Sequence, residues 1–122
     1  MVFMTVSFWP ITIWNVVLKW VGFMAILSII YTAIPSLYPS FLPVAATATV
    51  LTAVGGVGDW TVLQWLGNLK ALSIGWFGMT AIIWMVAWLW GGTHVSLGTA
   101  GWMALCLGPL EYSLHRWLMG VE

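Results

Sequence analysis

Charge is what this sequence has least of. Its 122 residues include three Lys+Arg and three Asp+Glu, a charged fraction of 5%, whereas soluble domains carry about 25%. Hydrophobic residues make up 62% of the chain, and the mean hydropathy is +1.03. Because so little polar surface cannot cover a soluble domain of this length, we expect an integral membrane protein surrounded by the lipid bilayer.

Basic runs and cysteines are also scarce. The formal net charge is zero, which excludes the basic footprint of a nucleic-acid-binding protein and a polybasic lipid-binding patch. Cys106 is the single cysteine, so an intramolecular disulfide is excluded. Its apolar surroundings indicate a buried, inert thiol.

Catalytic and cofactor motifs are missing as well. No nucleophile stands beside a base, and the glycines from Gly55 to Gly58 lack the Lys-Ser/Thr of a phosphate loop. The nitrogen and sulfur donors are His94, His115 and Cys106, and His94 is predicted on the opposite side of the membrane from His115. A structural metal site wants three or four ligands, and haem between helices wants two facing histidines. We therefore predict no enzyme, no metal and no cofactor.

Four apolar stretches are present, at about residues 20–34, 41–58, 71–90 and 97–118. A helix needs about 20 apolar residues to cross a bilayer. Pro35 and Pro39 mark the first turn, and Gly91-Gly92 ends the third stretch. The predicted fold class is an all-α membrane protein, with residues 19–122 forming a four-span antiparallel helical bundle.

Residues 1–18 form a hydrophobic N-terminal extension. The extension has neither a positive start nor a small-residue cleavage pattern, so we expect it to be retained rather than removed as a signal peptide. It is either an interfacial helix or continuous with the first span. Lys19 favours the interface, since a lysine near mid-bilayer costs roughly 2.5 kcal/mol or more.

The stretch from Gly55 to Lys70 gathers glycines, amides and charges in the middle of the chain, and we interpret it as a polar connector between two pairs of spans. Small residues also recur within the spans, where they let helices approach closely. This pattern predicts association with further copies of the chain or with another membrane protein. The predicted helix-contact glycines are Gly55, Gly56, Gly58, Gly75, Gly78, Gly98, Gly101 and Gly108.

The basic residues indicate the orientation. With four spans, Lys19, Lys70 and Arg116 all fall on one side of the membrane. The positive-inside rule makes that side the cytoplasm, with both termini there.

Polar residues gather on the same side. We predict one connected polar cluster of Asp59, Asn68, Lys70, Glu111, His115 and Arg116. Glu111 is expected to be its deepest charge, roughly 7 Å inward of Arg116. His115, one helical turn away, is its nearest partner. The simpler alternative is that Asp59 forms an interfacial ion pair with Lys70 or Arg116.

The arrangement resembles the YndM-like family of small four-helix bacterial membrane proteins. The matching residues are Lys19, Thr52, Gly58-Asp59 with Leu63, Gly67-Asn68 with Ala71, Glu111, and His115-Arg116 with Trp117. Gln64 and Gly75 depart from the family pattern, which has a proline and an acidic residue there. The resemblance implies four helices and a location in the bacterial cytoplasmic membrane, and it implies no activity.

Two functions fit these features. The favoured one is a structural or accessory membrane component that associates through its small-residue helix faces, because no continuous polar stripe follows any span. The alternative is an oligomeric small-solute or ion channel or transporter with a polar cluster at its cytoplasmic end.

Overall fold

The structure is a computed structural model that describes residues 8–118, apart from the side chains of residues 8–12, 60–65 and 118. Those side chains, and residues 1–7 of the predicted extension, lie outside the description. The described chain is all-helical and contains no strand, which confirms the all-α prediction. Its elements are α2 (Phe8–Ala33), a short 3-10 helix η1 (Pro35–Leu37), α3 (Phe41–Leu66), α4 (Asn68–Trp90) and α5 (Leu97–Leu118).

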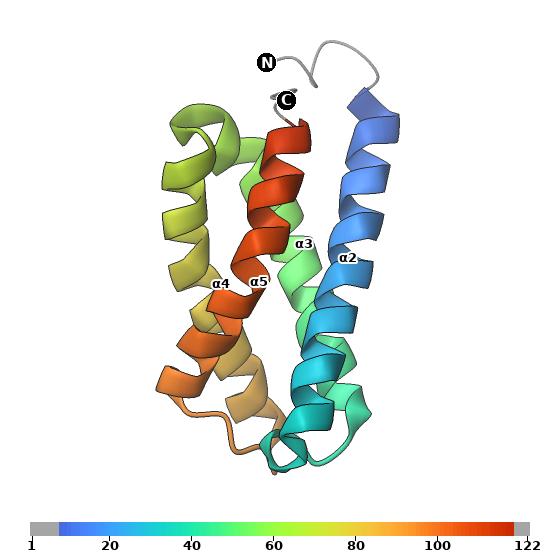
Figure 1. Cartoon of the computed structure of the whole chain (residues 1–122), viewed down its shortest axis with the longest axis vertical. Helices are drawn as coiled ribbons and strands as arrows, with labels where there is room; N and C mark the ends of the chain where they lie inside the picture. The colour runs from blue at the N-terminus through green and yellow to red at the C-terminus, as the bar shows by residue number, and fades with distance from the viewer. Residues whose placement is uncertain (1–7, 119–122) are drawn as a thin grey trace.

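The four long helices form an up-and-down bundle (Figure 1). Each helix packs against the next one in the chain, and α5 returns to pack against α2. The pairs α2–α4 and α3–α5 therefore lie across the diagonals. The start of α2, the α3–α4 junction and the end of α5 meet at one end, which we call the polar end. The turn at η1 and the α4–α5 loop lie at the other, the far end.

Three of the described helices are long and apolar enough to cross a membrane. The candidate spans are Ile13–Ala33, Phe41–Asp59 and Asn68–Trp90. Large apolar side chains such as Ile29, Phe77 and Leu89 point outward and are about 70% exposed, as lipid-facing residues would be. These features are compatible with a multi-pass membrane protein.

The start of the bundle differs from the predicted first span. The helix α2 begins at Phe8 and continues without a break to Ala33, so residues 8–18 are continuous with the first span. Pro10 lies in the first turn, where its missing N–H leaves no hydrogen bond unmade.

The predicted connector is also helical. From Gly55 to Leu66 the chain belongs to α3, and α4 already begins at Asn68. Gly67 alone separates them, with a φ of 81° that favours glycine. This stretch joins the α2–α3 pair to the α4–α5 pair, but it is helical except at Gly67, so both neighbouring helices extend beyond the predicted bounds of 58 and 71. A helix satisfies its backbone groups internally, which a bilayer requires.

The far half of the bundle has an apolar core. It includes Leu27 and Ile30 of α2, Val44 of α3 and Ile83 of α4, which are all buried. The two far-end turns are joined by a hydrogen bond from the backbone N–H of His94 to the carbonyl of Leu37, at 2.8 Å.

Candidate functional site

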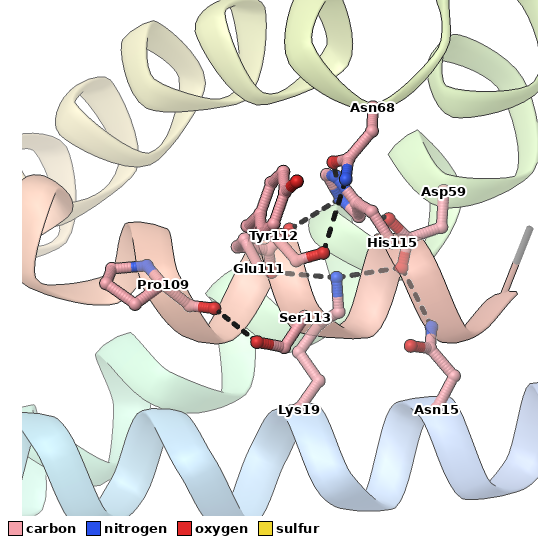
Figure 2. Close-up of polar contacts among 9 residues, drawn as sticks. All are labelled: Asn15, Lys19, Asp59, Asn68, Pro109, Glu111, Tyr112, Ser113 and His115. Carbon is pink, nitrogen blue, oxygen red and sulfur yellow. Dashed lines mark hydrogen bonds and ion pairs between the residues drawn. The ribbon is translucent and has the colours of Figure 1, made fainter. Parts of the chain in front are cut away.

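The ammonium of Lys19 lies at the centre of the polar end (Figure 2). Its Nζ is 2.8 Å from Oδ2 of Asp59 on α3 and 2.8 Å from Oε1 of Glu111 on α5. The side chain is 0% exposed. One buried lysine therefore joins three helices, and its side chain lies inside the bundle rather than on the bundle surface.

His115 bridges the same two carboxylates from the other side. Its Nε2 is 3.1 Å from Oδ1 of Asp59 and 3.0 Å from Oε2 of Glu111. The contact with Glu111 follows from their i,i+4 spacing on one helix. The contact with Asp59 crosses the α3–α5 diagonal, so side chains, rather than backbone packing, connect this pair of helices.

The other nitrogen of the His115 ring faces α4. Its Nδ1 is 2.9 Å from Oδ1 of Asn68, whose Nδ2 points to the carbonyl of Tyr112 at 3.4 Å. Both ring nitrogens thus face oxygen acceptors. The ring donates hydrogen bonds on both sides only when each nitrogen carries a hydrogen. With His115 as an imidazolium, two positive charges balance the carboxylates of Asp59 and Glu111.

Two further residues complete the site. Asn15, one turn before Lys19 on α2, donates from Nδ2 to Oδ2 of Asp59 at 2.8 Å. Its own Oδ1 is buried and has no hydrogen-bond partner among the described residues. Gly55 makes room for the lysine, because a Cβ there would lie 3.2 Å from Nζ and 3.3 Å from Cδ of Lys19. We call Asn15, Lys19, Asp59, Asn68, Glu111 and His115 the ion cluster.

A cavity of about 170 Å³ adjoins the ion cluster. Three members of the cluster, Asp59, Glu111 and His115, line one part of it. The remaining wall is apolar or bare backbone, and it contains four glycines, two each from α3 and α4. The other lining residues are Phe23, Leu51, Val54, Gly55, Gly58, Ala71, Ile74, Gly75, Gly78, Met79 and Ile82.

The cavity reaches the outside of the bundle between α3 and α4. Val54 and Ile74 in its wall are 50% and 49% exposed, and Gly78 is exposed too. In a bilayer this side faces lipid. The cavity is therefore partly open at the side of the bundle rather than fully enclosed by its helices.

Three residues of the ion cluster also have the side chains of metal ligands. Asp59, Glu111 and His115 offer three donor atoms within 4.8 Å of one another. The ammonium of Lys19 already contacts one oxygen of each carboxylate. A metal ion would have to share both carboxylates with that fixed positive charge, which weakens its binding.

The structure brings together Asp59, Asn68, Glu111 and His115 of the predicted polar cluster. Lys70 is exposed, and Arg116 lies over the ring of Tyr112, with 5.9 Å from its Cζ to the ring centroid.

Asn15 and Lys19 belong to the ion cluster but were not predicted as members of it. Their spacing could have indicated this, because they are two polar residues one turn apart on an apolar helix. Glu111 and His115 show the same pattern.

The predicted contact glycines fall into two groups. At Gly55 and Gly101 a Cβ would press on a side chain of the neighbouring helix, Lys19 and Trp76 respectively, and at Gly56 it would touch Val16 at 3.8 Å. At the others a Cβ would meet no neighbouring helix within 4 Å: Gly58, Gly75, Gly78, Gly98 and Gly108. Gly22, which was not among the predicted contact glycines, also makes a close approach, because Leu110 of α5 lies against its backbone.

The chain was compared with family models, curated proteins and solved structures. No family model, no curated protein and no solved structure matches the chain. Its function must therefore be argued from the ion cluster and its cavity.

Proposed function

We propose that this chain is a four-span membrane protein that binds a small solute or ion at the buried ion cluster and belongs to a pathway for that solute across the membrane. The observation that carries the proposal is the cavity whose wall includes Asp59, Glu111 and His115. Ionisable groups inside a membrane protein are expensive and usually mark such pathways. An apolar cavity with a few convergent polar groups is the usual form of a small-molecule site.

The fourth span of this proposal is α5. Its 22 residues give a length of about 33 Å, enough for a hydrocarbon core of about 30 Å. Two of the residues that lower its hydropathy, Glu111 and His115, are buried in the ion cluster. Its outward side chains include Leu97, Trp102 and Leu105, which suit lipid.

The polar end is proposed to face the cytoplasm. Lys19, Lys70 and Arg116 belong to the half of the bundle at this end, and the positive-inside rule assigns the basic side to the cytoplasm. A reporter that works only in the cytoplasm tests this orientation. It should be active when fused after Glu122 and silent when inserted at Ser96, and the reverse pattern would contradict it. A bacterial cytoplasmic membrane and the YndM-like family remain proposals from the sequence.

A second candidate is the structural or accessory role favoured by the sequence. It is supported by the completeness of the pairing, since Lys19 and His115 connect α2, α3, α4 and α5 through their contacts. Polar side chains do hold helices together in lipid, at about 0.6 kcal/mol for an average contact. In this role the chain would associate with further copies or with a larger membrane complex.

Reconstitution into liposomes distinguishes the two candidates. Its oligomeric state in detergent is measured first, because four helices alone enclose little beyond their own side chains and a continuous pathway would need several copies. Proton entry is then followed with an internal pH dye, and small-solute entry by light scattering after osmotic shock. Flux above that of empty liposomes supports the pathway. A monomer whose liposomes are as tight as empty ones leaves the pathway without a route and favours the structural role.

A further inference from the structure

We propose that the ligand of the cavity is a small organic cation with an apolar body, and that its binding displaces the proton of His115. This inference rests on the proposed function, because it names the class of solute for the same site. It draws on three features of the site: the charge balance, the composition of the cavity wall and the lateral opening.

The charge balance selects a cation. The groups around the His115 ring are Asp59 from α3, Glu111 from its own helix, Asn68 from α4 and, across the carboxylates, Lys19 from α2. With a neutral imidazole this set carries one net negative charge, and the imidazolium brings it to zero. One monovalent cation replaces one proton without leaving an uncompensated charge. An anion would add an uncompensated negative charge.

The exchange is a simple proton transfer. The N–H bond at Nε2 of His115 breaks and the proton passes to water, while the cation takes its place near the two carboxylates. The neutral ring keeps its hydrogen on Nδ1, where Asn68 accepts it. The ammonium of Lys19 keeps its contacts on the other carboxylate oxygens.

The cavity wall selects an apolar body. Away from the ion cluster it consists of apolar side chains such as Phe23, Leu51 and Ile82 and of four glycines. An apolar cavity of about 150 Å³ accommodates benzene, and this one measures about 170 Å³. Its opening toward lipid between α3 and α4 suits a molecule that first partitions into the bilayer. A strongly hydrated cation such as Na⁺ would lose its water shell there without enough oxygen ligands to replace it.

Two probes of the same shape test the charge requirement. Phenyltrimethylammonium is a permanent cation with no proton of its own, and tert-butylbenzene replaces its nitrogen with carbon. Binding of each to the purified full chain is measured by calorimetry in two buffers of different ionisation enthalpy, which counts the protons released. We expect the cation to bind at least tenfold more tightly, to release one proton, and to gain about tenfold in affinity per pH unit while His115 is protonated.

Matched variants test whether the two probes bind in the cavity. Gly75→Leu puts a side chain into the cavity, since a Cβ at Gly75 meets nothing within 4 Å, and it should abolish binding of both probes. Gly98→Leu makes the same change on α5 outside this cavity and should bind both normally. His115→Gln should remove the proton release and the pH dependence. If that variant does not fold, the number of protons that the wild type releases still tests the exchange of the cation for a proton.

The remaining outcomes separate this inference from the function on which it rests. Equal binding of both probes with no proton release overturns the cation exchange and leaves a solute site in place. Binding that Gly75→Leu does not reduce comes from partitioning into detergent, and it overturns the cavity as the site. Absence of binding by either probe overturns both the inference and the proposed solute site.

Discussion

The two ends of this bundle solve the same packing problem in opposite ways. At the far end, buried residues such as Leu27, Val44 and Ile83 hold the helices through apolar packing. At the polar end, four ionisable groups are buried within hydrogen-bonding distance of one another, beside a cavity. The far end shows that this chain can associate its helices without buried charge. The ion cluster therefore calls for an explanation beyond cohesion.

The energetics point the same way. A buried ion pair loses hydration, and replacing the whole group with well-packed apolar residues is often neutral or stabilising. The titratable residue buried at the far end, Tyr38, illustrates the contrast. Burial raises the pKa of Tyr38, so its phenol remains neutral and adds no charge to the core.

Removing Lys19 should have the largest effect on the comparison. Lys19→Met leaves the carboxylates of Asp59 and Glu111 buried without their ammonium, which should lower the free energy of unfolding by about 3–5 kcal/mol. The double variant Lys19→Met/Glu111→Gln removes one charge of each sign and should recover most of that loss. Denaturation in detergent measures both. A double variant no more stable than the single one would contradict the ion cluster as a balanced unit.

Truncation of the apolar core is the matching change at the far end. Leu27 is fully buried, and Leu27→Ala should cost about 2–5 kcal/mol by leaving a cavity. The loss should be the same at acidic and alkaline pH, because Leu27 belongs to a core cluster of apolar residues. A strongly pH-dependent loss would mean that the two ends are coupled and cannot be treated as separate regions.

Alanine substitutions at two glycines of the polar end test how tightly Lys19 is packed. Gly58→Ala adds a methyl group with nothing within 4 Å and should stabilise the helix by about 0.5–1 kcal/mol. The same change at Gly55 pushes on Lys19, and overpacking of this kind costs about 1–3 kcal/mol. We expect a net loss for Gly55→Ala when both unfolding free energies are measured. Equal gains for the two variants would show that Lys19 is not held in place.

The smallest effect is expected at the far-end surface. Ser96 precedes α5, and its Oγ accepts a hydrogen bond from the backbone N–H of Thr99 at 3.1 Å. Loss of this helix cap in Ser96→Ala should cost about 1 kcal/mol. Ser73→Ala, which removes an exposed hydroxyl inside α4, should stay within about 0.5 kcal/mol. The same denaturation experiment compares them, and an equal cost would remove the capping role.

The all-helical fold could be predicted because a bilayer forces helices on so apolar a chain. The pairing of Glu111 with His115 could also be predicted, since their i,i+4 spacing places them on one face of a helix. The partners of Lys19 could not be predicted, because the insertion cost used was that of an unpaired lysine and the sequence does not show its tertiary contacts with two carboxylates. The glycines from Gly55 onward indicated a connector, but Gly55 and Gly58 lie within α3 and form part of the cavity wall.

The central claim is that the ion cluster holds one exchangeable proton on His115, and nitrogen NMR of the histidine rings tests it most directly. The exposed His94 at the far end is the internal control, and a His94→Gln variant assigns the signals. At neutral pH both ring nitrogens of His115 should carry hydrogen, and saturation with phenyltrimethylammonium should leave hydrogen on Nδ1 alone. A His115 ring with a single protonated nitrogen both before and after the cation is added would contradict the account.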